Sequence, residues 1–174
     1  METKGMPLLV SKSDKFSLYG YKSEKELEKL AVRYSKEIFG KNVFYLNTKK
    51  KLVSKKGIAG IPDGFLVDFE SKKLYIVEIE LSSHDIVRHI SNQLMRFKAA
   101  MSNNVMRAEM AKDFHDKIVK DRPSISLEHI RDITNKQFGI VILIDSVSEQ
   151  LAEIVSILSQ DGTEVLAIPF ETYA

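Results

Sequence analysis

Two apolar stretches separated by a short polar segment predict a β-hairpin in the middle of the chain. Residues 64–69 read GFLVDF and residues 74–81 read LYIVEIEL, and both are rich in aromatic and β-branched side chains. Residues 70–73 between them read ESKK, which is typical of a turn. Because side chains alternate between the two faces of a strand, we expect Glu78 and Glu80 on one face, about 6.6 Å apart.

The register of this hairpin decides whether a third carboxylate joins the two glutamates. A two-residue turn at Ser71-Lys72 would place Asp63 opposite Glu80, on the face that also carries Glu78. A shift of one residue would turn Asp63 to the other face. Three carboxylates on one face repel one another unless a cation lies among them, and hard oxygen ligands suit Mg²⁺ or Mn²⁺.

Apolar residues at helical spacing predict one helix before the hairpin and one after it. The first covers residues 24–40, with Ser23 as the expected N-cap of a capping box. The second covers residues 84–98, with Ser83 as the expected N-cap. Further helices and strands follow, with helices expected at 105–120, 126–135 and from residue 148, and strands at 138–145 and 163–170.

This alternation of helices and strands predicts an α/β protein with a mixed central β-sheet flanked by helices. We expect one domain over residues 1–174, because 174 residues are enough for one sizeable core and no linker interrupts them. The segment around residues 102–136 reads as a helical insertion into this domain.

A Pro-Asp pair, a hairpin and an acidic strand motif together resemble the PD-(D/E)xK nuclease superfamily, the restriction-endonuclease-like fold. The matching residues are Pro62-Asp63 and Glu78-Ile79-Glu80. The resemblance implies a three-layer sandwich and metal-dependent hydrolysis of phosphodiester bonds. It also implies that Mg²⁺ or Mn²⁺ is held by Asp63, Glu78 and the Ile79 carbonyl. Glu80 replaces the usual lysine of the motif, which leaves it to act as a general base or as a ligand of a second metal ion.

Both helices that flank the hairpin carry residues that the resemblance assigns to the site. Gln93 with Phe97 resembles the Gln-x-x-x-Tyr element of many such nucleases, so Gln93 is expected to position a water or a phosphate oxygen. The first helix often donates a glutamate, for which Glu28 is the first choice and Glu24 the second. The alternative is that these two glutamates form solvated pairs with nearby lysines. Lys98 is a candidate for the role of the missing lysine.

Positive charge gathers in two places, although the net charge of the chain is only +2. On both sides of the carboxylates these charges would hold a phosphate backbone, whereas lysine-rich hairpin tips can also serve only to protect edge strands. The residues expected to bind nucleic acid are Lys49, Lys50, Lys51, Lys55, Lys56, Arg88 and Arg96.

Composition excludes several other classes of site. The chain has no cysteine, which excludes disulfides, thiolate zinc sites and cysteine nucleophiles. No apolar run approaches the roughly 20 residues of a membrane helix, and residues 1–5 lack the apolar core of a signal peptide, so a cytoplasmic protein is expected. His84, next to the predicted site, is expected to face water at the start of the helix, with a role as a base or a phosphate contact as the alternatives.

The expected partner is nucleic acid, with DNA as the first choice and RNA left open. Cutting both strands of a duplex needs two sites, so a homodimer is also considered. Two alternatives to catalysis remain. The fold could keep its acids without turnover and bind nucleic acid, or it could be an assembly subunit that docks a helicase or methyltransferase partner through residues 102–136.

Overall fold

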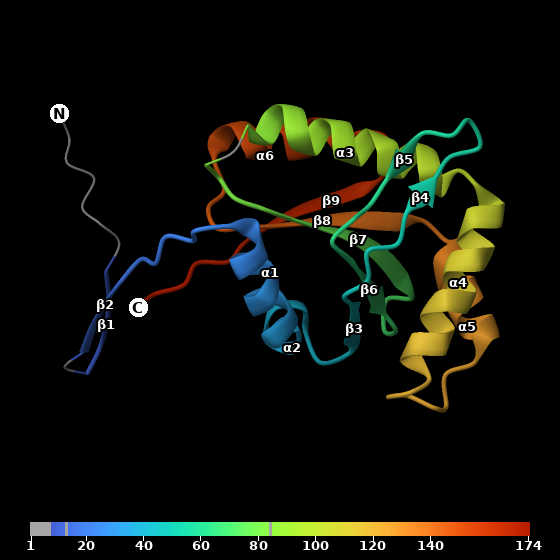
Figure 1. Ribbon diagram of the computed structural model, residues 1–174, viewed down its shortest axis with the longest axis horizontal. Helices are drawn as coiled ribbons and strands as arrows, with labels where there is room; N and C mark the ends of the chain where they lie inside the picture. The colour runs from blue at the N-terminus through green and yellow to red at the C-terminus, as the bar shows by residue number, and fades with distance from the viewer. Residues whose placement is uncertain (1–7, 13, 84) are drawn as a thin grey trace.

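The computed structural model describes residues 8–12, 14–83 and 85–174, which fold around one central sheet (Figure 1). The sheet has five strands in the order β3-β6-β7-β8-β9. The pairs β3–β6 and β6–β7 are antiparallel, and the pairs β7–β8 and β8–β9 are parallel, which confirms the predicted mixed sheet. The strands are β3 (Val43–Leu46), β6 (Gly64–Asp68), β7 (Lys73–Glu80), β8 (Phe138–Ile144) and β9 (Glu164–Pro169). His84 lies outside the described residues.

Six helices in the described part of the chain pack on the two faces of this sheet. Helices α1 and α2 lie on one face, and α3 to α6 lie on the other, with α3 and α6 side by side (Figure 1). The helices are α1 (Glu24–Arg33), α2 (Ser35–Phe39), α3 (Ile86–Met101), α4 (Asn104–Ile118), α5 (Leu127–Asn135) and α6 (Glu149–Leu158). None of these helices is both long enough and apolar enough to cross a membrane.

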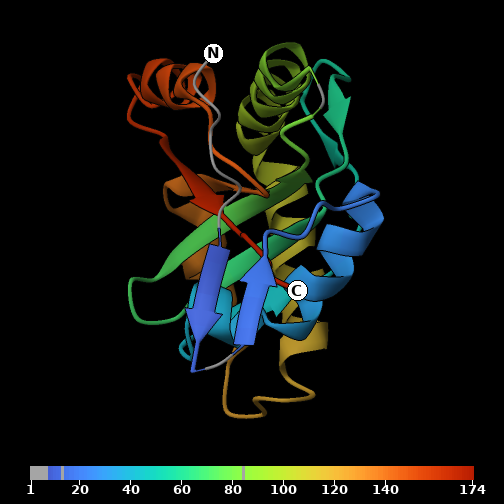
Figure 2. The same ribbon diagram turned by 90° about the vertical axis from the view of Figure 1, so that its left-hand side faces the viewer.

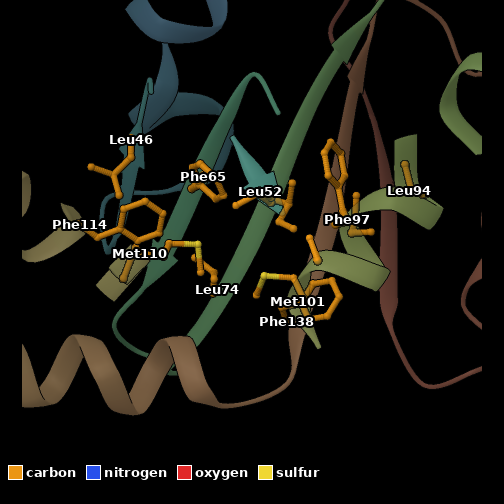
Figure 3. Close-up of a cluster of buried hydrophobic side chains, with 14 of the residues drawn as sticks. Leu46, Leu52, Phe65, Leu74, Leu94, Phe97, Met101, Met110, Phe114 and Phe138 are labelled. Atoms are coloured by element: carbon orange, nitrogen blue, oxygen red, sulfur yellow. The ribbon is translucent and has the colours of Figure 1, made fainter. Parts of the chain in front are cut away.

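The larger hydrophobic cluster fills the space between the sheet and helices α3 to α6 (Figure 3). The rings of Phe65 and Phe114 lie 4.8 Å apart within it, and Phe97 of α3 is fully buried. A smaller cluster joins Leu27 and Ala31 of α1 to the opposite face of the sheet. Strand β8 is buried along its whole length, as its unbroken apolar run predicts for a strand covered on both faces.

The alternation of side chains along β7 determines the face on which its acids lie. Ile76 belongs to the cluster on the α3 side, and Ile79 belongs to the cluster on the α1 side. Glu78 and Glu80 have the same parity as Ile76, so they continue its row on the α3 side of the sheet. They therefore lie at the carboxyl end of β7, where the row of core side chains ends.

The register of the β6–β7 hairpin differs from the predicted one. Gly64 pairs with Val77, so the loop covers four residues, and the predicted two-residue turn at Ser71-Lys72 is wrong. Asp63 consequently does not lie opposite Glu80. The shift amounts to two residues, however, and a shift by an even number keeps each side chain on its predicted face.

Asp68 is the physical reason for the longer loop. Its Oδ1 accepts hydrogen bonds from the backbone N–H groups of Glu70 and Ser71, at 2.9 and 3.1 Å. Its Oδ2 accepts a third bond from the Ser71 hydroxyl at 2.6 Å. Lys72 then closes the loop with a φ of 53°, in the left-handed region. An aspartate that satisfies the backbone of its own turn in this way competes with a tighter hairpin.

The first predicted helix is interrupted. Tyr34, with φ −108° and ψ 23°, separates α1 from α2, and Gly40 ends α2 with a φ of 97°. Ser23 takes the N-cap position but forms no side-chain cap, whereas Glu26 accepts a hydrogen bond from the Lys22 N–H at 3.0 Å. Glu26 thus bonds to the residue before the N-cap and not to the Ser23 N–H, so the predicted capping box is wrong.

The helix after the hairpin begins later than predicted. Asp85 is its N-cap and accepts a hydrogen bond from the Arg88 N–H, so the prediction that Ser83 caps this helix is wrong. The helices predicted at 105–120 and 126–135 are confirmed as α4 and α5, with ends that differ by one or two residues. These two helices pack against each other at one end of the sheet (Figure 1).

Two small hairpins lie outside the central sheet, and neither was predicted in full. The first joins β1 (Leu8–Ser11) to β2 (Asp14–Ser17), and the end of the chain pairs with it through Ser17 and Ala174 (Figure 2). The second joins β4 (Leu52–Val53) to β5 (Ala59–Gly60) and packs on α3. A Cβ atom at Gly60 would lie 2.7 Å from the Phe97 ring, so only glycine permits this close packing.

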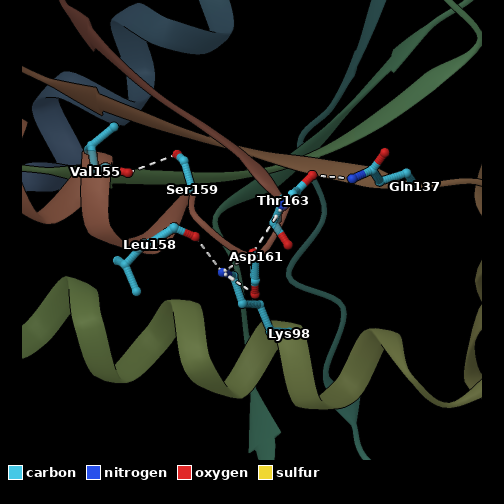
Figure 4. Close-up of polar contacts among 8 residues, drawn as sticks. Lys98, Gln137, Val155, Leu158, Ser159, Asp161 and Thr163 are labelled. Carbon is cyan, nitrogen blue, oxygen red and sulfur yellow. Dashed lines mark hydrogen bonds and ion pairs between the residues drawn. The ribbon is translucent and has the colours of Figure 1, made fainter.

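Lys98 of α3 binds the C-terminal end of α6 through hydrogen bonds and an ion pair (Figure 4). Its Nζ donates to the Leu158 carbonyl at 2.6 Å and to both carboxylate oxygens of Asp161 at 2.9 and 3.0 Å. It also lies about 13 Å further along the helix axis than His89, which contacts the acids of β7. The suggestion that Lys98 replaces the missing motif lysine is therefore contradicted.

Candidate functional site

Asp63 lies just before β6 and ties the start of this strand to the end of β7. Its backbone N–H donates to the Val77 carbonyl at 3.0 Å, and its Oδ2 accepts a bond from the Ile79 N–H at 2.8 Å. These two bonds lie on either side of Glu78 in the sequence of β7. The structure therefore brings Asp63 and Glu78 together, although through a register that was not predicted.

Glu78 is a buried carboxylate that lacks a hydrogen-bond partner for one of its oxygens. The residue is 7% exposed, and its Oε1 has no partner among the described residues. Burial raises the pKa of Glu78 to about 9, and the charges of Asp63 and Glu80 act in the same direction, whereas Lys49 opposes them. An unsatisfied buried oxygen of this kind costs free energy that a bound cation or a proton would recover.

Lys49 connects the carboxylate of Asp63 to the first helix. Its Nζ forms an ion pair with Asp63 and lies 3.3 Å from Glu28 Oε1, so Lys49 links Glu28 of α1 to Asp63, and a direct role of Glu28 in a metal site stays a prediction. Burial acts to lower the pKa of Lys49, but Asp63 and then Glu28 outweigh it and raise that pKa. The lysine that was expected on a phosphate-binding surface therefore lies at the centre of the acidic cluster.

Glu80 is the most deeply buried acid of the cluster, with 3% exposure. Its Oε2 is bonded to Nδ1 of His89, and its Oε1 accepts a bond from the Leu81 N–H at 3.2 Å. The side chain of His89 is 53% exposed, so its other ring nitrogen can reach solvent. Glu80 thus joins the end of β7 to α3.

Gln93 and Tyr45 each carry a buried polar group. Gln93 follows His89 by four residues on α3, so the two side chains share one side of the helix. Its Oε1 and the Tyr45 hydroxyl are buried without a hydrogen-bond partner among the described residues. Burial raises the pKa of Tyr45, and Asp63 and Glu28 raise it further, which places the phenol close to those two carboxylates.

The acids do not form a ready-made metal cage. Within the described residues, no three side chains of histidine, aspartate or glutamate converge closely enough to hold a metal ion. The Lys49 ammonium lies between Glu28 and Asp63 instead. The donor set nevertheless fits a hard cation, because it offers carboxylate oxygens and leaves Glu78 Oε1 unsatisfied.

The other cations of the predicted nucleic-acid-binding group lie in the segment between β3 and β4, in the β4–β5 hairpin and on α3. Lys50 pairs with Asp113 of α4. Lys55 and Lys56 lie at the tip of the β4–β5 hairpin, which packs on α3 next to Arg96 (Figure 2). Besides Lys49, the exposed members of the predicted group are Lys51, Lys55, Lys56, Arg88 and Arg96. The hairpin therefore lies beside α3, and the expectation that these cations hold a phosphate backbone on both sides of the carboxylates stays a prediction.

Three residues of the site were not assigned to it from the sequence. Lys49 was expected to bind a phosphate backbone, and neither His89 nor Tyr45 received a role. Because His89 follows Glu80 at the start of a helix, their contact depends on how sharply the chain turns between β7 and α3. Lys49 and Tyr45 belong to β3 and the loop after it, whose distance from Asp63 no local pattern encodes.

Comparison of the chain with models of known protein families, with curated proteins and with solved structures found no match. The assignment of a function therefore depends on the residues and the geometry of this site. Its features are two buried acids on β7, an aspartate bonded to the same strand, and a lysine that bridges to α1.

The raised pKa of Glu78 predicts a stability that depends on pH. The unfolded chain ionises this group near pH 4.5, and the folded protein ionises it only near pH 9. The contribution of Glu78 to the free energy of unfolding is therefore fully present below pH 4.5 and is lost as the pH rises toward 9. Glu78→Gln should be more stable than the wild type at pH 8, by on the order of 2 kcal/mol, and equally stable at pH 4.5.

Urea unfolding in EDTA at the two pH values measures this difference. Glu153→Gln, an exposed acid on α6, is the matched control and should change stability little at either pH. A Glu78→Gln variant that is less stable than the wild type at pH 8 would contradict the claim that the buried Glu78 carboxylate destabilises the folded protein at that pH.

Proposed function

We propose that this protein is a metal-dependent nuclease of the PD-(D/E)xK type that hydrolyses phosphodiester bonds, with DNA as the expected substrate. The observation that carries the proposal is the bond from Ile79 N–H to Asp63, which holds Asp63 against the buried Glu78 at the end of β7. These are the two acids to which the sequence resemblance assigns the metal.

The arrangement of the elements supports the proposal. The order α1–β3–β6–β7–α3–β8 gives a helix, three antiparallel strands, a second helix and a parallel strand, which resembles the core of that superfamily. Helices α4 and α5 lie between α3 and β8, where the sequence predicted an insertion. We therefore propose the restriction-endonuclease-like three-layer sandwich as the specific fold.

Asp63 and Glu78 are the residues that would hold Mg²⁺ or Mn²⁺. Mg²⁺ in phosphoryl-transfer sites is bound by one or two carboxylates and keeps several waters, so a cage of three protein ligands is not required. The Ile79 carbonyl remains a proposed third ligand. A bound ion would polarise the scissile phosphate and lower the pKa of a bound water.

The other residues of the site hold and orient the reacting groups. Gln93, whose Oε1 is buried and unsatisfied, accepts a hydrogen bond from the attacking water in our proposal. Glu80 fixes His89 through the ring Nδ1, which directs the other ring nitrogen outward. Glu28 orients the Lys49 ammonium through their ion pair. This is the only role that we assign to the first helix.

The exposed cations supply affinity for the nucleic-acid backbone. Lys55 and Lys56 at the hairpin tip, together with Arg88 and Arg96 of α3, contact phosphates without reading bases. Because the net charge of the chain is only +2, this local group carries most of the attraction.

One observation favours a second candidate function, a nucleic-acid-binding protein without turnover. Lys49 neutralises Asp63 and Glu28 directly, and the motif lysine is replaced by a buried glutamate. A site whose acids are already paired in this way can persist without a metal. Such a protein would bind nucleic acid in EDTA as well as in Mg²⁺.

Cleavage of labelled nucleic acids decides between these two functions. A panel of single- and double-stranded DNAs and RNAs is incubated with Mg²⁺, Mn²⁺ or EDTA. We expect metal-dependent cleavage by the wild type and a loss of at least 100-fold in Asp63→Asn and Glu78→Gln. Glu153→Gln should cut like the wild type. Binding without cleavage under every metal would contradict the nuclease and support the second candidate.

The proposed phosphate contacts predict a change in salt dependence. Lys55→Glu with Lys56→Glu should weaken DNA binding, because the variant releases fewer counterions on association. The slope of log K against log salt should become less steep by about 1 to 2. Fluorescence anisotropy at several salt concentrations measures it, with Arg131→Glu and Lys136→Glu as a charge-matched control on exposed positions away from the hairpin. Equal slopes for both double variants would refute the hairpin contact.

A further inference from the structure

The position of the motif lysine holds a residue that cannot do what a lysine does there. Glu80 is negatively charged when ionised, it is 3% exposed, and its carboxylate is bonded to His89 and to the Leu81 N–H. If the site cleaves phosphodiesters, the fixed positive charge of that motif has to come from another part of the chain.

A lysine ammonium does lie at the carboxylates, but it comes from the loop after β3. Nζ of Lys49 pairs with Asp63 and with Glu28 Oε1 at 3.3 Å. Its charge also acts on Glu78. The side chain is 49% exposed, so the ammonium contacts the acids from the side that remains open to solvent and to a substrate.

Neighbouring contacts hold this lysine in place. Lys50 pairs with Asp113, and the Lys117 ammonium donates to the Thr48 hydroxyl, so the residues before and after Lys49 are both fastened to α4. The loop is further tightened by bonds from Thr48 N–H to the Leu46 carbonyl and from Lys50 N–H to the Thr48 carbonyl, each 2.9 Å. A side chain that starts from a loop held this firmly is pre-organised toward one site.

We infer that Lys49 is the catalytic lysine of this site, in place of the lysine that the motif lacks. The inference rests on the proposed nuclease function and adds the residue that contacts the scissile phosphate. Lys49 keeps its proton and its charge throughout the reaction. Its ammonium donates to a non-bridging phosphate oxygen and stabilises the negative charge that develops on the phosphoryl group.

The hydrolysis that Lys49 assists is balanced without a further reactant. The oxygen of a water bonds to phosphorus as the bond from phosphorus to one ester oxygen breaks, and that bond's electron pair stays on the leaving oxygen. One proton of the attacking water passes to solvent, and the leaving oxygen takes one proton from solvent. Lys49 gains and loses no proton in this sequence.

The absence of cysteine from the chain allows a direct test. Lys49→Cys introduces a single thiol, and 2-bromoethylamine alkylates it to a side chain of lysine length that again ends in an ammonium. We expect kcat of Lys49→Cys to fall about 10²- to 10³-fold with little change in KM, and to return toward the wild-type value after alkylation. Lys112→Cys, at an exposed lysine of α4 that belongs to neither the acidic cluster nor the predicted nucleic-acid-binding group, is the matched control and should keep its kcat before and after alkylation.

Mn²⁺ binding and urea unfolding distinguish a catalytic lysine from a structural one. Lys49→Cys should bind Mn²⁺ at least as tightly as the wild type, because it removes a positive charge beside Asp63, and it should remain folded. Lys49→Gln, which keeps a polar side chain without the charge, should reproduce the loss of kcat if Lys49→Cys proves unstable.

The possible results separate this inference from the proposed function. If the wild type cleaves and both Lys49→Cys and Lys49→Gln cleave as fast as the wild type, the proposed role of Lys49 is overturned. The proposed nuclease function would still hold. A folded Lys49→Cys that loses kcat and stays inactive after complete alkylation would also overturn it. A wild type that cleaves no substrate under any metal would overturn both.

Discussion

The crowding of buried carboxylates at the end of β7 is the constraint on which the arrangement of this protein depends. Glu78 and Glu80 occupy positions that apolar side chains hold earlier in the same strand, and both are almost completely buried. Asp63 adds a third acid beside them. Such a cluster is unfavourable unless hydrogen bonds, opposite charges or protons compensate it, and the surrounding contacts supply that compensation.

Two of the three acids are compensated, each by a different part of the chain. Asp63 binds a backbone N–H of β7 and the Lys49 ammonium, Glu80 binds His89 of α3, and Glu78 is left with an unsatisfied oxygen. Two hydrophobic clusters, one on each face of the sheet, hold together the elements that meet here. These elements are β3 with its following loop, the β6–β7 hairpin, α1 and α3. Stability elsewhere in the fold therefore maintains a locally unfavourable site, which is the usual pattern of a functional one.

The sequence predicts the main elements because their patterns are local. The apolar run of β8, the start of α6 at Ser148 and the alternation along β7 each depend on neighbouring residues, and all are confirmed. The faces of Asp63, Glu78 and Glu80 survive an error in register only because the error is two residues. The error arose because the Asp68 carboxylate accepts hydrogen bonds from the backbone of its own turn. The residue types of the turn do not reveal these side-chain bonds, so the longer loop could not be predicted from them.

The contacts that were missed are those between segments distant in sequence. Lys49 lies 14 positions before Asp63, and the pairing of Ser17 with Ala174 joins opposite ends of the chain. No periodicity encodes such distances, because they follow from how the sheet, α1 and α4 pack together. The candidate acids could therefore be predicted, whereas the lysine and the histidine that compensate them could not.

The central claim is that Asp63 and Glu78 form a site for a divalent cation, and direct binding of Mn²⁺ tests it most simply. Titration followed by electron paramagnetic resonance near neutral pH needs no substrate and no turnover. The account predicts saturable binding by the wild type that weakens at least tenfold in Asp63→Asn and in Glu78→Gln. The absence of saturable binding, or binding that both substitutions leave unchanged, would contradict it.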